Sequence, residues 1–97
     1  MENNNMPILE MHLIVSGQVQ GVGFRAAVLH YARRLEIKGT VRNLPDGNVE
    51  IYAQGPKEKL DRLIEHLHKH NGLALIHSMD VNHYSPKNLF ADFAIIR

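Results

Sequence analysis

Residues 17–25 read Gly17-Gln18-Val19-Gln20-Gly21-Val22-Gly23-Phe24-Arg25, and this stretch separates two different hydrophobic patterns. Before it, apolar residues alternate as in a strand over residues 10–16. After it, apolar residues recur at helical spacing over residues 24–35. Glycines let backbone N–H groups approach an anion closely, a helix N-terminus carries partial positive charge, and arginine matches an oxyanion with its planar fork. We therefore expect this loop to hold a phosphoryl group.

The remaining chain continues to alternate between strand and helix patterns. Leu44-Pro45-Asp46-Gly47-Asn48 predicts a tight hairpin turn, because proline fixes φ and Asp-Gly supplies a positive φ. Residues 57–69 carry apolar positions at i, i+3, i+4 and i+7, as in an amphipathic helix. The further strands that we expect cover residues 38–43, 48–54, 74–84 and 90–96.

This order, βαββαβ plus one extra strand, predicts the α+β class and a ferredoxin-like α/β sandwich. We expect an antiparallel sheet with both helices on one face. Residues 1–9 predict a frayed N-terminus, and residues 10–97 predict a single domain.

Composition narrows the kind of partner. The chain has 97 residues with a net charge of +1 and no cysteine. Bulk charge gives no support to a nucleic-acid or membrane partner, and no apolar run approaches the length of a membrane span. The absence of cysteine and the polar start fit a cytoplasmic protein. We expect a monomer that acts on a small molecule.

Three other interpretations of the loop are open to the sequence. It could simply connect a strand to a helix. Residues 21–26 also match the Gly-x-Gly-x-x-Ala dinucleotide pattern, but that site needs a parallel sheet, whereas a hairpin follows the second strand here. A P-loop is excluded because no Gly-Lys-Ser/Thr follows.

Two side chains stand out as candidates for chemistry. Arg25 lies at a helix start, where a cation is unfavourable against the helix dipole unless an anion is bound; the alternative is an ordinary surface arginine. Asn43 shares a strand face with Val41 and so points toward the helices. Its alternative role is an Asx turn leading into Pro45.

Two longer motifs resemble the signatures of the acylphosphatase family. These are residues 17–25 and Gly-Thr-Val-Arg-Asn-Leu-Pro-Asp-Gly-Asn-Val-Glu at 39–50. Residues 53–56 and the apolar positions of the last strand fit as well, so the resemblance extends from about Met11 to Ile96. It implies a ferredoxin-like fold, no metal, no cofactor, and hydrolysis of acyl phosphates to a carboxylate and inorganic phosphate.

The resemblance also implies roles for individual residues. Arg25 would be catalytic by binding the phosphoryl group, and Asn43 by positioning the attacking water. The phosphate-binding residues, acting mainly through their backbone, would be Gln18, Val19, Gln20, Gly21, Val22, Gly23, Phe24 and Arg25. Many family members carry a basic residue at the position of Gln18 and tryptophan at that of Thr40. A noncatalytic anion-binding module of the same fold is the alternative function.

The reaction itself explains why two side chains would suffice. The leaving group of an acyl phosphate is a carboxylate, a weak base that departs without a general acid. Phosphoryl transfer depends mainly on positioning and charge stabilisation. Because a neutral amide is not a strong base, Asn43 would only orient water, and the proton would pass to a phosphate oxygen. No cysteine is present to form a phosphocysteine intermediate.

Seven histidines raise the question of a metal. On the predicted helix, only His66 and His70 share a face, and no third ligand is placed beside them by sequence. We therefore expect structural or solvated histidines and no metal site.

Overall fold

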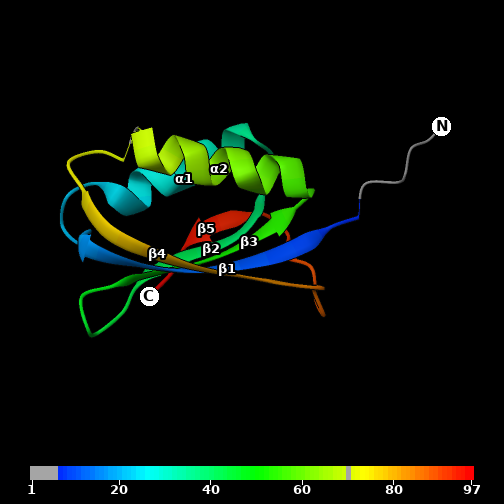
Figure 1. Cartoon of the computed structure of the whole chain (residues 1–97). Coiled ribbons are helices and arrows are strands. Elements are labelled where there is room, and N and C mark those ends of the chain that lie inside the picture. Colours follow the sequence, from blue (N-terminus) through cyan, green and yellow to red (C-terminus); the bar gives the residue numbers. More distant parts are fainter. Residues whose placement is uncertain (1–6, 70) are drawn as a thin grey trace.

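Two helices cover one face of a five-stranded sheet and leave the other face open (Figure 1). The computed structural model describes residues 7–69 and 71–97. The elements are β1 (Leu9–Gln18), α1 (Phe24–Arg34), β2 (Lys38–Asn43), β3 (Val49–Gly55), α2 (Lys57–Lys69), β4 (Leu75–Tyr84) and β5 (Phe93–Ile95). The predicted ferredoxin-like α+β sandwich is therefore confirmed, with both helices on one face of the sheet as expected.

The sheet has the strand order β4-β1-β3-β2-β5. β3 pairs antiparallel with both β1 and β2, so β1 and β2 run in the same direction on either side of it. Val49 of β3 lies opposite Val15 of β1 and opposite Asn43 of β2. The C-terminal ends of β1 and β2 therefore meet at one end of the sheet, with β3 between them.

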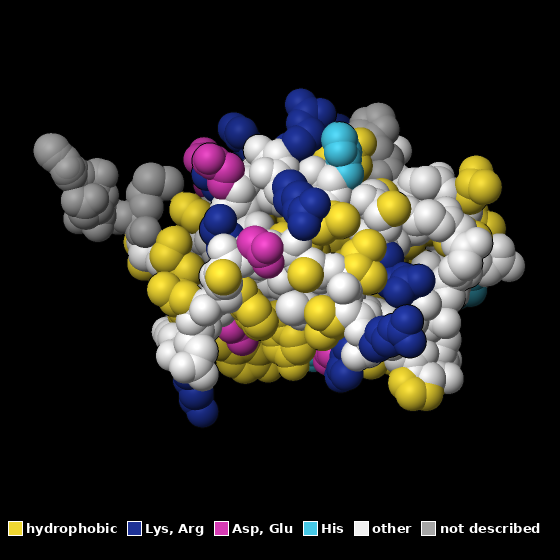
Figure 2. All heavy atoms as spheres, turned by 180° about the vertical axis from the view of Figure 1, so that it is seen from behind, with side chains coloured by type: hydrophobic (Ala, Val, Ile, Leu, Met, Phe, Trp, Pro, Cys, Tyr) yellow, Lys and Arg dark blue, Asp and Glu magenta, His cyan; other side chains and the backbone are white. Residues whose placement is uncertain are grey.

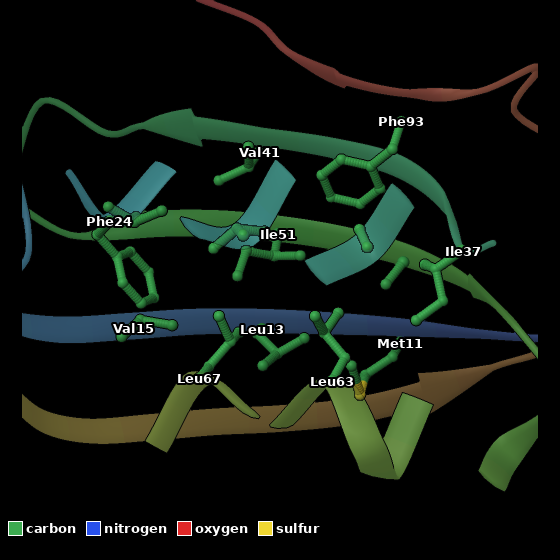
Figure 3. Close-up of a cluster of buried hydrophobic side chains, with 14 of the residues drawn as sticks. Met11, Leu13, Val15, Phe24, Ile37, Val41, Ile51, Leu63, Leu67 and Phe93 are labelled. Carbon is green, nitrogen blue, oxygen red and sulfur yellow. The ribbon is translucent and has the colours of Figure 1, made fainter. Parts of the chain in front are cut away.

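The core lies between the sheet and the two helices (Figure 3). The period-2 pattern of the strands and the helical stripe place their apolar residues in this one layer. Its largest fully buried side chains include Phe24, Phe93, Met11, Leu13, Ile51, Leu60, Leu63 and Leu67. Val19 and Phe24, near the two ends of the glycine-rich loop, are each 1% exposed, so the loop is anchored in the core at both ends.

The prediction of an antiparallel sheet is wrong for one strand pair, because β5 pairs parallel with β2. After β4, the segment 85–92 crosses one end of the sheet to the opposite edge. Gln54, only 2% exposed, holds it there: Nε2 donates to the Asn88 carbonyl at 2.7 Å, and Oε1 accepts the Phe90 N–H at 2.9 Å. This crossing uses residues that we expected in the last strand, so β5 is shorter than predicted.

β1 is longer than predicted at both ends. It begins at Leu9, which pairs with Gly55, and it continues through Gln18 past an irregularity at Ser16/Gly17. Gly17 has a φ of 126°, and a Cβ there would lie 2.1 Å from the Leu75 carbonyl oxygen. Gly17 is therefore required by close contact with β4 and is not part of the turn that follows.

Candidate active site

The loop between β1 and α1 ends in a glycine cap. Gly23 precedes the helix with a φ of 82°, and as a glycine it offers the first turn no side-chain cap. The Ala27 N–H donates to the Gly23 carbonyl at 3.1 Å, so the N–H groups of residues 24–26 precede the regular helical bonds. Gly21 also has a positive φ, 74°. The turn thus presents backbone donors at the positive end of the α1 dipole.

Arg25 adds a full positive charge to this end of the helix. Its side chain is half-buried, and the first turn of α1 contains no acidic residue. Within residues 7–69 and 71–97, no carboxylate or other acceptor pairs with its guanidinium. A cation placed against the helix dipole without a protein counterion favours a bound anion.

A cavity of about 210 Å³ opens beside Arg25. Its lining combines backbone from the loop, the start of α1 and one apolar side chain of β5. The lining residues are Val19, Gly21, Gly23, Phe24, Arg25, Ala26 and Ile95. Because the Val19 and Phe24 side chains are buried in the core, what these two residues can offer a ligand is their backbone.

Asn43 lies at the end of β2 on the helix side of the sheet. Its Oδ1 is buried, and no donor from the described residues reaches it. The Asx turn in this hairpin is made instead by Asp46, whose Oδ1 accepts the Asn48 N–H at 3.0 Å. The Asx-turn interpretation of Asn43 is therefore wrong. A buried amide oxygen without a protein donor retains its full capacity to accept from a ligand or water.

Sheet topology and one side chain bring the loop to the hairpin that carries Asn43. The Gln20 Nε2 donates to the carbonyls of Leu44 and Asn48, both at 2.8 Å. Ile95 of β5, which lines the cavity together with the loop, pairs with Val41, two residues before Asn43. The loop after β1 therefore reaches across the end of β3 toward β2.

The eight predicted phosphate-binding residues are not equivalent in the structure. Gln18 is an exposed strand residue that pairs with Leu75 of β4. The Gln20 side chain bonds to the hairpin, and the Val22 carbonyl accepts the Leu73 N–H at 3.0 Å. The other five, residues 19, 21 and 23–25, line the cavity.

Two contributors were missed by reasoning from sequence. Ile95 supplies an apolar wall of the cavity, and the pattern of the last strand marked it only as a strand residue. Gly72 packs against the loop: a Cβ there would lie 2.9 Å from the Val22 carbonyl oxygen, and its φ is 73°. An Asn-Gly pair such as Asn71-Gly72 is typical of a turn, but it does not indicate which residues the turn contacts.

On the open face of the sheet, Glu50 joins two basic side chains. His12 Nε2 lies 2.8 Å from Glu50 Oε2, and Arg42 Nε donates to Glu50 Oε1 at 2.7 Å. Burial raises the pKa of the Glu50 carboxyl, but hydrogen bonds and charge from His12 and Arg42 outweigh it, so the net pKa lies below the ordinary 4.5. This cluster is a structural ion-pair network on the face opposite Asn43.

The histidines form no metal site within the described residues. His70 lies outside them; His66 stacks on Tyr31 with ring centroids 4.8 Å apart. No group of three metal-ligating side chains gathers within residues 7–69 and 71–97. In the same part of the chain, none of the helices has the length and hydropathy of a membrane span.

Known proteins are similar to this chain in both sequence and fold. The family model for acylphosphatase matches residues 11–95. An acylphosphatase of Methylococcus capsulatus is 39% identical over 87 residues, which cover 90% of this chain and 95% of that protein. The chain thus belongs to the acylphosphatase family.

Solved structures agree with this assignment. The acylphosphatase structure from Bacillus subtilis superposes with a TM-score of 0.87 at 32% identity, covering 92% of this chain and 99% of that one. An acylphosphatase from Coxiella burnetii gives a TM-score of 0.86 at 30% identity, covering 99% and 100% of the two chains. The similarity therefore extends over the whole fold that holds the loop and the hairpin.

Proposed function

We propose that this protein hydrolyses acyl phosphates to a carboxylate and inorganic phosphate. The observation that carries the proposal is the half-buried Arg25 in the first turn of α1, beside a cavity of about 210 Å³ and without a protein counterion among the described residues. A phosphoryl group there would receive backbone N–H donors and the arginine fork together. The names of the relatives support the acyl phosphate as the ligand.

In the proposed mechanism, Arg25 and the N–H groups of the loop stabilise charge on the phosphoryl oxygens. Asn43 Oδ1 accepts a hydrogen bond from the attacking water and so fixes its direction toward phosphorus. The water oxygen then forms a bond to phosphorus as the P–O bond to the acyl group breaks, and the electron pair of the broken bond leaves with the carboxylate. One proton of the water passes to a phosphate oxygen, so no residue of the chain acts as a general base. The carboxylate leaves without being protonated, so no residue acts as a general acid.

A catalytic role is favoured over a noncatalytic anion-binding module by Asn43. Binding alone needs the loop and Arg25, whereas a buried acceptor left without a donor is unfavourable unless it serves a ligand or water.

Around the site, Ile95 offers apolar surface for the acyl part of a substrate.

For its partners, we expect a small-molecule substrate and no nucleic acid. Lys and Arg side chains are scattered among acidic and apolar ones on the face shown in Figure 2, without a continuous basic patch. The net charge of +1 agrees with this expectation. A monomer in the cytoplasm remains our expectation from the sequence, where the lack of cysteine fits a reducing compartment.

The test is hydrolysis of benzoyl phosphate by the purified chain. We expect Arg25→Ala to abolish both turnover and stabilisation by inorganic phosphate. Arg34→Ala is the matched control, since this exposed arginine lies at the opposite end of the same helix. A wild-type protein without activity, or an Arg25→Ala variant that keeps both properties, would refute the proposal.

Asn43→Ala separates binding from turnover. We expect its turnover to fall at least about a hundredfold, because the water loses its orientation, while phosphate still stabilises the fold. Asn82→Ala, an exposed asparagine on β4, is the control for the substitution itself. An Asn43→Ala variant with the wild-type rate would remove this residue from the mechanism.

A further inference from the structure

The Gln20 side chain makes an unusual double contact between two separate parts of the site. Its single amide nitrogen donates to the Leu44 and Asn48 carbonyls, each at 2.8 Å. Those two residues form the neck of the hairpin turn, which the Leu44 N–H closes by donating to the Asn48 carbonyl at 2.8 Å. Both hydrogens of the amide group are therefore directed at the hairpin and not at the cavity.

The position of this contact matters because β1 and β2 are not neighbours in the sheet. β3 separates them, so no ladder hydrogen bond fixes the loop after β1 relative to the end of β2. Leu44 directly follows Asn43. The Gln20 amide thus connects the anion-binding loop to the backbone adjoining the residue that would hold the water.

The loop has a second attachment on its other side. The Val22 carbonyl accepts the Leu73 N–H at 3.0 Å, which ties the loop to the turn between α2 and β4. Arg25 and the first N–H groups belong to α1, which the buried Phe24 and Val28 hold against the sheet. Loss of the Gln20 amide would therefore leave the anion-binding half of the site supported by α1, Leu73 and the buried Val19, but not by the hairpin.

We propose that Gln20 is a positioning residue that sets the separation between the bound phosphoryl group and Asn43. The proposal rests on the proposed function and adds to it a residue that acts through Asn43 without touching the substrate. When the amide is removed, the hydrogen bonds that fix the hairpin relative to the loop are lost, and the water is no longer aligned with phosphorus. Turnover falls while the affinity for phosphate is retained.

The first experiment replaces the amide with an apolar group of similar length, Gln20→Met. We expect kcat for benzoyl phosphate to fall by about ten- to a hundredfold, the effect of a small misalignment of reacting groups. We expect the dissociation constant for inorganic phosphate, measured by calorimetry, to change by less than about threefold. Equal losses in kcat and phosphate affinity, or an unchanged kcat, would overturn the proposal.

Asp46→Ala is the matched control. It removes the side-chain bonds of Asp46 to Asn48 and so weakens the same turn, but it leaves the Gln20 donor in place. We expect it to lower thermal stability and to keep the wild-type kcat. A kcat loss in Asp46→Ala as large as in Gln20→Met would assign the effect to turn stability and overturn the positioning role.

A second variant, Gln20→Glu, keeps the shape and gives a pH signature. Its ionised carboxylate faces two carbonyl oxygens and cannot donate, whereas the protonated acid donates one hydrogen bond. We expect the ratio of variant to wild-type kcat to rise as the pH is lowered toward about 5, closer to the ordinary pKa of a glutamic acid. A ratio that stays constant with pH would overturn the proposal.

These outcomes are separable from failure of the proposed function. If the wild type hydrolyses no acyl phosphate, the function itself is wrong; if it is active and Gln20→Met retains its kcat, only the role of Gln20 is wrong. If Gln20→Met does not fold, Gln20→Glu carries the test. Failure of both to fold, while Asp46→Ala folds, would make Gln20 a structural residue and overturn the proposal.

Discussion

Substituting Gly72 by alanine tests whether the turn after α2 supports the anion-binding loop. A Cβ at this position would lie 2.9 Å from the Val22 carbonyl oxygen and 3.4 Å from the Gly23 carbonyl. Both contacts are with backbone, so the loop must shift. Because Gly23 caps α1, the shift displaces the first N–H groups of the helix, which are the proposed phosphate donors.

The magnitude has two parts. An alanine at a φ of 73° costs about 1–2 kcal/mol relative to glycine. Lengthening the Leu73–Val22 hydrogen bond costs about a further 1 kcal/mol. We therefore expect the free energy of unfolding to fall by about 2–3 kcal/mol and Tm to fall by about 10–20 °C in a domain of this size.

The control is Gly47→Ala in the hairpin turn. Gly47 has a φ of 94°, but a Cβ there would have no atom of the described residues within 4 Å. This variant experiences the backbone strain alone, about 1–2 kcal/mol, and no displacement of the loop. The difference between the two variants measures the contact with Val22.

The assay is thermal unfolding with and without inorganic phosphate. At a phosphate concentration a hundredfold above Kd, the wild type and Gly47→Ala should gain about 2.7 kcal/mol. A tenfold weaker Kd in Gly72→Ala reduces this gain to about 1.4 kcal/mol. Equal phosphate stabilisation in the two variants would refute the idea that Gly72 supports the binding loop.

Three further predictions concern other parts of the molecule. Glu50→Gln should lower the free energy of unfolding by about 1–2 kcal/mol at pH 7. Because a lowered pKa stabilises the fold only above that pKa, the difference from wild type should disappear as the pH falls through the pKa of Glu50. An equal difference in denaturant titrations at pH 7 and 3 would contradict this. Gly39→Ala would place a Cβ 1.8 Å from the Tyr52 carbonyl oxygen, so we expect more than about 4 kcal/mol of destabilisation, and circular dichroism showing a wild-type transition would disprove it. Benzoyl phosphate hydrolysis should persist in excess chelator, because the proposed mechanism uses only Arg25, Asn43 and backbone donors; loss of activity would refute that mechanism.

Local patterns were sufficient to predict the layers of the fold. The alternation of apolar and polar residues in β2 and β3 and the apolar stripe of α2 are local features of the sequence. The burial of these elements follows the same patterns. The direction of β5 was not predictable in this way. It depends on segment 85–92 crossing the sheet, which Gln54 supports from more than thirty positions away, as in its bond to Asn88.

In the candidate site, too, the features that depend on neighbouring residues were predictable and those that depend on distant contacts were not. Arg25 and Gly23 could be assigned because a helix start, a glycine cap and a cation are adjacent in sequence. The same reasoning misassigned Gly17 to the loop, since the close approach of Leu75 that requires this glycine is a contact with a distant strand. The resemblance implied only a phosphate-binding role for Gln20. Its contact with the hairpin was not predictable, because both acceptors lie in a turn that is distant in sequence.

The central position of β3 also has a consequence for how the enzyme reaches its active form. Neither β1 nor β2 can align its end with the other until β3 has docked between them, and the β1–β3 register joins residues such as Val15 and Val49 that are distant in sequence. Such non-local pairing is slow to form. The rate at which hydrolysis recovers during refolding would therefore report the rate at which β1 and β3 pair. A helical signal that returns earlier would come from chains that have formed α1 and α2 but cannot yet turn over substrate.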